Sequence, residues 1–571
     1  MKFFCFLAIV CALVVPSRAL DREAFTFTKY DLSVRVEPDQ QRLGVRGKIM
    51  LRNDSTFPQK TIALQISSSL DWKSIQAGGN AVEFVTHEYT SDIDHTGALS
   101  EAIVTLTREV PPKGTIELDV GYEGVIPLDV TRLMRIGVPE DKAKHTDWDQ
   151  ISKSFTAVRG IGYVAWYPVA TESANLSEAN SVDETVGRWK TREADADLEI
   201  KLTHTGEGFS EPPDLLSNGK GGKQLYEQMG RAYSVQTEYS FDPLGSTVPT
   251  FVIASYQKLA PNDLLAIHYL PGQEAGAKEY AEVATDIDPV LAIGTGSGSL
   301  QILGLPDPDA ASFVSEGMLL CPLKSPITNE GTLDIVYAQA SHLMSSPRVW
   351  IHDGLAHYAQ AAFVADQAGR QAALNYLTAH RTPLVEAEKA KPHAAEWEAV
   401  HSLINAPDDL YLQTKAMDVW WMLRDMLGSP SLGVLLNYHA TEDKDGNYMQ
   451  RVIEKQTQRD LQWFFDDWVY RDRGLPDFRV DSVYARPIVD GGFMVTITIE
   501  NLGDAGAEVP VFLRTESEEI IKRLEVHAKS KAAVRIETVS APQEVVVNDG
   551  SVPESDTSNN GFKVPPRDPA K

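Results

Sequence analysis

The feature that most constrains this chain is the period of its apolar residues, which changes twice. From Tyr30 onwards, segments such as YDLSVRVEP, TIALQIS and AIVTLTREV alternate apolar with polar residues and are rich in β-branched side chains. This pattern is typical of antiparallel strands that bury one face. It returns in DLEIKLTHT and TFVIASYQ, so residues 20–255 are predicted to form an all-β domain.

After Asn262 the period becomes that of helices. The segment TKAMDVWWMLRDMLG places apolar residues on one helical face, namely Ala416, Val419, Trp420, Leu423 and Leu427. A second aromatic helix, DLQWFFDDWVYRDRGLP, is ended by Gly474 and Pro476. Residues 256–476 are therefore predicted to form a mainly α domain.

Strand patterns resume at Phe478 and indicate a small β-sandwich over residues 477–550. Residues 551–571 are rich in Pro, Ser, Asn and Asp, a composition that predicts a disordered tail. The run GTGSGS at 294–299 is predicted to be a loop, because no Lys-Ser/Thr pair follows it to form a phosphate-binding motif. The predicted fold class is multidomain α+β.

The N-terminus has the composition of a secretory signal peptide over residues 1–19. Lys2 precedes an apolar run from Phe3 to Val15, and small residues lie three and one before an expected cut near Leu20. The protein is therefore expected to be exported, either to a periplasm or to the medium. Every later apolar stretch is interrupted by charge, Gly or Pro, so no membrane span is predicted.

Cysteine content and charge exclude several classes of protein. Two of the three cysteines lie in the predicted signal peptide, which leaves Cys321 alone and excludes both an intramolecular disulfide and a CxxC metal site. The formal net charge is −27 at pH 7. Such an acidic chain is not expected to bind nucleic acid.

The order of these regions, the opening YDLSVRVEP and the segments WWMLRDMLG and DLQWFFDDWVYRDRGLP resemble the membrane alanyl aminopeptidase family of zinc metallopeptidases, the gluzincins. The resemblance covers nearly the whole mature chain. It implies an N-terminal β-sandwich-like domain, a thermolysin-like α domain and a small C-terminal β-sandwich. The tryptophans of these segments, Trp420, Trp421, Trp463 and Trp468, are expected to pack in the core.

In that family an HExxH helix supplies two zinc-binding histidines and a catalytic glutamate, and a second helix supplies a carboxylate as third ligand. The segment WIHDGLAHYAQ is similar to the family's W-x-x-E-G-x-A-x-Y pattern, which implies that Asp353 stands at the carboxylate position. In TLDIVYAQASHL, the same matching puts His342 at the second histidine and Ala338 at the first. The catalytic glutamate then falls on Gln339.

These positions depart from the family pattern in their chemistry. Gln339 cannot accept a proton as a general base, and one imidazole with one carboxylate falls short of the three protein ligands of a catalytic zinc. His342 and Asp353 are also only eleven positions apart, fewer than is usual in the family. The family's transition-state tyrosine matches Gln413, with Tyr411 two residues away.

Further residues have both a functional and a structural interpretation. Glu316, in SEGMLL, matches the family's glutamate for the substrate amine. His342 alone is more often a hydrogen-bonded histidine of a core or cleft. The cluster of His352, Asp353 and His357 could bind a metal, but the spacing puts His352 on a different helical face. Another set is expected to lie on a solvated helical face, namely His393, Glu396 and His401.

Three hypotheses therefore remain open. In the first, the protein is a pseudopeptidase without a cofactor that binds a peptide or protein ligand in its cleft. In the second, it is an active aminopeptidase whose zinc is held by His342, Asp353 and an unidentified ligand, with Tyr411 assisting. In the third, it is an interaction scaffold whose β domains carry the contacts. None of them specifies an oligomeric state.

Overall fold

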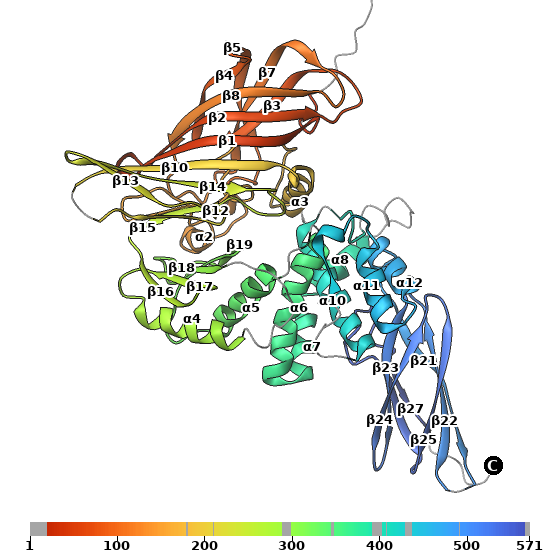
Figure 1. Ribbon diagram of the computed structural model, residues 1–571. Coiled ribbons are helices and arrows are strands. Elements are labelled where there is room, and N and C mark those ends of the chain that lie inside the picture. Colours follow the sequence, from red (N-terminus) through yellow and green to blue (C-terminus); the bar gives the residue numbers. More distant parts are fainter. Residues whose placement is uncertain are drawn as a thin grey trace, which may run out of the picture.

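A computed structural model of the chain describes residues 20–178, 181–208, 211–287, 299–343, 346, 348–390, 402–406, 408–428, 437–489 and 491–565. The predicted signal peptide, most of the GTGSGS run and the set of His393, Glu396 and His401 lie outside these ranges. The chain is multidomain and mixes sheets with helices, as the sequence predicts. In Figure 1 a strand-rich N-terminal part is followed by a helical part and then by a second strand-rich part.

The N-terminal part is built on a nine-stranded sheet with the order β12-β14-β10-β1-β2-β8-β4-β5, in which β13 also pairs with β14. Its strands are β1 (Phe25–Glu37), β2 (Arg42–Asn53), β4 (Leu70–Ala77), β5 (Asn80–Ala81), β8 (Thr115–Val125), β10 (Asp197–Glu207), β12 (Lys220–Gly221), β13 (Leu225–Met229) and β14 (Ala232–Phe241). A three-stranded sheet consists of β3 (Gln59–Ser67), β7 (Ala98–Val110) and β6 (Glu83–Thr90). Another consists of β11 (Asp214–Ser217), β15 (Phe251–Ala254) and β9 (Phe155–Val158).

The alternation seen in the sequence is what buries this part of the chain. In β1 the side chains of Tyr30, Leu32, Val34 and Val36 are buried and those between them are exposed. The prediction of an all-β region is incomplete, because three helices also lie in it: α1 (Thr131–Arg135), α2 (Glu140–Thr146) and α3 (Ser181–Glu193).

The middle part contains the predicted helices and also a mixed sheet that the sequence does not predict. Its helices are α4 (Glu274–Ile287), α5 (Asn329–Leu343), α6 (Val349–Ala368), α7 (Arg370–Ala379), α8 (Thr382–Ala390), α10 (Asp409–Leu427), α11 (Tyr448–Thr457) and α12 (Gln462–Phe465). Its sheet has the order β16 (Gln257–Asn262), β17 (Leu265–Tyr269), β18 (Leu300–Gly304), β20 (Met318–Cys321), β19 (Phe313–Ser315). Its inner strands are short and mostly apolar, and periodicity cannot distinguish such segments from helix.

The helices α6 and α10 cross closely because a glycine lies at the contact. A Cβ at Gly354 would lie 2.5 Å from the Cβ of Ala416, so only glycine allows this approach. Beside it the rings of Trp350 and Trp420 stack with centroids 5.3 Å apart, and the Trp420 Nε1 donates to the Trp350 carbonyl at 3.1 Å. The helix α10 begins at its N-cap Asp408, whose side chain accepts from the backbone N–H of Tyr411.

The C-terminal part pairs two antiparallel sheets. One has the order β21 (Phe478–Pro487), β22 (Phe493–Asn501), β25 (Lys531–Thr538), and the other β24 (Glu519–Val526), β23 (Ala507–Thr515), β26 (Pro542–Val547), β27 (Gly561–Lys563). Its apolar residues belong to the same cluster as those of α6 and α10. Within the described ranges, no helix has the length and apolarity needed to cross a bilayer.

The prediction of a disordered tail is wrong for residues 551–565. β27 pairs with β26, and Val552 is buried in the core. The Glu554 carboxylate accepts hydrogen bonds from the Phe478 N–H and the Asn560 Nδ2, each at 2.9 Å. The composition argument fails here because a few anchoring residues are enough to order a polar segment.

Candidate functional site

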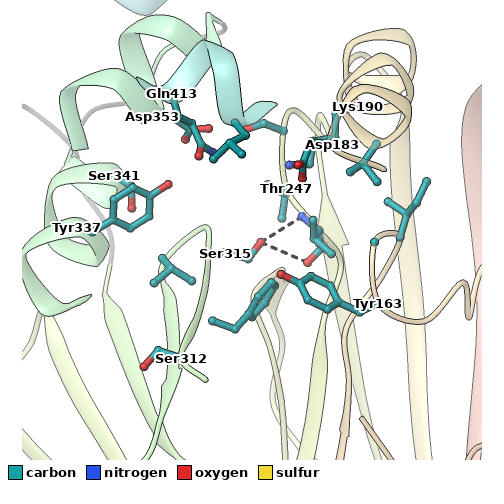
Figure 2. Close-up of a pocket in the computed structure, with 18 of the residues that line it drawn as sticks. Tyr163, Asp183, Lys190, Thr247, Ser312, Ser315, Tyr337, Ser341, Asp353 and Gln413 are labelled. Carbon is teal, nitrogen blue, oxygen red and sulfur yellow. Dashed lines mark hydrogen bonds between the residues drawn. The ribbon is translucent and has the colours of Figure 1, made fainter. Parts of the chain in front are cut away.

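A cleft of about 570 Å³ lies where the N-terminal part meets the helices. Figure 2 shows it from the side, with Tyr163, Asp183, Lys190 and Thr247 on one wall and residues of α5, α6 and α10 on the other. The strand β19 and the turn after it contribute the remaining edge, with Ser315 and Glu316. The cleft is therefore assembled from segments that are distant in the sequence.

The edge formed by β19 is fixed to the N-terminal part by hydrogen bonds. The Ser315 Oγ accepts from the Val248 N–H at 3.1 Å and from the Asn218 Nδ2 at 3.0 Å. One residue further on, the Glu316 Oε2 accepts from the Thr247 Oγ at 3.2 Å. These contacts hold the Glu316 carboxylate at the rim of the cleft.

A buried arginine supports the same wall. The Arg159 guanidinium lies 3.7 Å from the ring centroids of both Trp148 and Tyr163, and its Nη2 lies 2.6 Å from the Asp149 Oδ2. Such a cation between two aromatic faces, paired with a carboxylate, fixes the orientation of the rings. Tyr163 thereby presents a rigid surface to the cleft.

The helix α5 turns a different face to the cleft from the one that the resemblance implies. Asp334, Tyr337 and Ser341 line the cleft, and their spacing of three and four residues places them on one helical face. Ala338 is fully buried in the core behind them. The Gln339 Nε2 donates to the Ala284 carbonyl of α4 at 2.6 Å, so this side chain points away from the cleft. The positions that face the cleft are thus Tyr337 and Ser341, one residue before the expected Ala338 and His342.

His342 and Tyr411 are likewise used elsewhere. A Cβ at Gly317, where φ is +69°, would lie 3.2 Å from the His342 Nδ1, so this ring packs beneath the turn that follows Glu316. The Tyr411 hydroxyl donates to Asp472, which also lies 3.1 Å from the Lys415 Nζ. Burial raises the pKa of Tyr411 well above its ordinary value. Neither side chain is among the described residues that line the cleft.

The helix α6 brings His352, Asp353 and His357 to the cleft, although the spacing predicts that His352 lies on another face. The His352 Nε2 lies 3.6 Å from the Asp353 Oδ1. The ring of His357 packs on Tyr337 with centroids 4.7 Å apart, and its Nδ1 lies 3.2 Å from the Gln360 Oε1.

The Nε2 of His357 is buried and has no hydrogen-bond partner among the described residues. Burial lowers the pKa of this histidine, so its neutral form is favoured. A buried polar atom that lines a cleft without a partner in the protein is a position where a ligand can form a hydrogen bond.

The residues of the cleft do not fit a zinc ion. Facing Asp353, α5 presents Tyr337 and Ser341 one turn apart, where the metallopeptidase pattern requires two histidines. Across the described part of the chain, no group of three His, Cys, Asp or Glu side chains lies close enough to hold a metal. The cluster of His352, Asp353 and His357 is included in this result.

The cleft is acidic. Four carboxylates line it, namely Asp183, Glu316, Asp334 and Asp353. Of the positive groups in its lining, Arg132 is paired with Asp147 at 2.7 Å, and Lys190 lies at one end, on α3. Burial raises the pKa of Asp334, and a hydrogen bond with Ser312 opposes the rise. Such a cleft attracts cationic groups.

Sequence reasoning missed Tyr337, Ser341, Asp334 and Asp183 as cleft residues. The spacing of Tyr337 and Ser341 equals that of the two residues expected from the resemblance, so spacing alone could not separate the two faces. No motif points to Asp183, and the sequence did not predict the helix α3 that carries it.

The comparisons with known proteins concern the fold. No protein-family model and no curated protein sequence matches the chain. Among solved structures, aminopeptidase A of Legionella pneumophila in complex with aspartic acid matches with a TM-score of 0.55 and 12% sequence identity. The match covers 92% of this chain but only 58% of that chain. The chain therefore has an aminopeptidase-like fold.

Proposed function

We propose that this chain is an exported protein of the membrane alanyl aminopeptidase type that binds peptides without hydrolysing them. The observation that carries the proposal is the cleft face of α5. This face presents Tyr337 and Ser341 one turn apart, at the spacing that the metallopeptidase pattern gives to two histidines, and neither side chain is a usual zinc ligand. A peptidase scaffold without ligands or base retains a cleft but not the chemistry.

The free amine of a peptide is the group that best complements this cleft. Glu316 at the rim and Asp353 on α6 offer carboxylates to an ammonium group, and charge-assisted hydrogen bonds are stronger than neutral ones. The unpartnered Nε2 of His357 can bond to the first peptide group. Tyr337 supplies an aromatic surface beside it.

The two residues that the resemblance assigns to hydrolysis are engaged elsewhere. Gln339 is bonded to the Ala284 carbonyl, and the Tyr411 hydroxyl is bonded to Asp472. Neither is available to activate water or to stabilise an oxyanion.

Metal content tests the proposal directly. We expect the purified mature protein to contain no stoichiometric zinc by elemental analysis. A variant with Tyr337→His, Ser341→His and Asp353→Glu is expected to take up zinc, because it places three ligands on the cleft face. The control carries Ala338→His, Gln339→Glu and Asp353→Glu, which follow the sequence alignment, and should stay empty. Stoichiometric zinc in the unmodified protein would favour the active aminopeptidase instead.

Peptide binding tests the second half of the proposal. We expect alanyl-alanine amide to bind in calorimetry and its N-acetylated form to bind at least about tenfold more weakly, since acetylation removes the cation. Equal binding of the two would contradict amine recognition. Binding of neither would favour a scaffold whose cleft has no ligand.

A further inference from the structure

A second hollow of about 370 Å³ adjoins the cleft. The two share Lys190 of α3 and Ser246 of the connection between β14 and β15 in their linings. The first turns of α10 lie between them, because Leu410 and Gln413 line the cleft and Leu412 lines the hollow. The two spaces therefore adjoin at Lys190 and Ser246.

One helical face forms a wall common to both spaces. Asp183, Val186 and Lys190 line the cleft, and Lys190 and Ala194 line the hollow. Their spacing of three, four and four residues keeps them on one side of α3 and of the turn that follows it at Ala194. Asp183 and Ala194 are separated by roughly 16 Å, at about 1.5 Å per helical residue. An extended peptide covers this distance with roughly five residues, at about 3.3 Å each.

The chemistry of the hollow differs from that of the cleft. Its apolar lining includes Val349, Leu403, Ile404, Ala406 and Leu412. Its described charged residues are Lys190, Asp195 and Arg348, of which Arg348 is paired with Asp443 at 2.7 Å. The hollow thus suits an apolar side chain, whereas the acidic cleft suits a cation.

We propose that the cleft and the hollow form one groove that holds an extended peptide of about five residues, with its free amine in the cleft and an apolar side chain in the hollow. This inference rests on the proposed function, because it assumes that a peptide amine enters the cleft. It adds the length of the ligand and a preference for an apolar residue far from the amine.

The experiment compares three probes by calorimetry: alanyl-alanine amide, the pentapeptide amide Ala-Ala-Ala-Ala-Leu, and the same pentapeptide ending in Asp. We expect the Leu pentapeptide to bind about tenfold to a hundredfold more tightly than the dipeptide, since it buries a leucine side chain. The Asp pentapeptide should gain little, because its side chain buries no apolar surface against Leu403, Ile404 and Leu412 and brings a second carboxylate near Asp195.

Two variants locate the effect. Ala194→Trp fills the hollow and should reduce binding of the Leu pentapeptide to that of the dipeptide, which itself should bind unchanged. Ala275→Trp, on an exposed site of α4, is the matched control and should change neither. Ile404→Ser removes apolar surface without filling space, and should abolish the preference for Leu over Asp. This variant tests the hollow independently if the tryptophan variant does not fold.

The outcomes separate the two proposals. If the dipeptide binds, but the Leu pentapeptide binds no better and Ala194→Trp has no effect, the groove is wrong while amine recognition stands. If no probe binds, amine recognition fails and the groove fails with it. Length-dependent binding that is lost in both hollow variants supports the groove.

Discussion

The two faces of α6 show what this chain has in common with the aminopeptidase pattern and what it lacks. On the packing face, Trp350, Gly354 and Tyr358 match the pattern, and each is buried against α10 or its neighbours. On the cleft face, Asp353 stands in place of the longer glutamate, opposite Tyr337 and Ser341 of α5. The residues that pack match the pattern, and the residues that would react do not. The resemblance is therefore evidence of the fold and not of the chemistry.

The largest effect is expected from breaking the packing face. Trp420→Ala should lower the free energy of unfolding by about 3–5 kcal/mol, because it removes the stack on Trp350 and leaves a cavity beside Gly354. Chemical denaturation measures this loss. Trp463→Ala is the control: its ring is only partly buried, against His527, and a smaller loss is expected. Equal losses of unfolding free energy in the two variants would show that the α6–α10 contact contributes no more to stability than the partly buried Trp463 does.

An intermediate effect should come from a carboxylate buried in the framework. Burial raises the pKa of Glu554 to about 7, so the folded state holds this proton more tightly than the unfolded state. The stabilisation is complete below the unfolded pKa of about 4.5 and is lost as pH rises towards 7. When the pH is raised from 5 to 8, the free energy of unfolding of the unmodified protein should fall by on the order of 2 kcal/mol more than that of the Glu554→Gln variant. An equal fall in the two proteins would contradict this.

The smallest effect on stability is expected from the cleft face. Asp353→Asn should leave the unfolding free energy within about 0.5 kcal/mol of that of the unmodified protein, because it lies away from the core. The same variant should still bind alanyl-alanine amide about tenfold more weakly, since one charged acceptor is lost. A large loss of stability without a loss of binding would show that Asp353 serves packing rather than ligand binding, and would contradict the distinction between the two faces of α6.

The sequence predicts the framework well where side-chain periodicity is strong, as in β1 and α10. It does not predict the mixed sheet of β16 to β20, because strands such as β20 are short, continuous apolar runs without a period. It also cannot choose the cleft face of α5. Tyr337 and Ser341 have the same spacing as Ala338 and His342, and only the packing of α5 on α4, where Gln339 bonds to Ala284, decides between them.

The hydrogen bond from the Arg381 Nη1 to the Gly550 carbonyl, at 2.8 Å, has a consequence for how the protein is made. Arg381 also pairs with Asp418 of α10, so one buried guanidinium joins the helices to a turn near the end of the chain. The apolar cluster that begins at Trp350 likewise extends to Val552. During synthesis the helices therefore cannot close their core until the chain up to Val552 has followed them, and a nascent chain stopped at the end of α12 would lack the core residues from Trp468 to Val552.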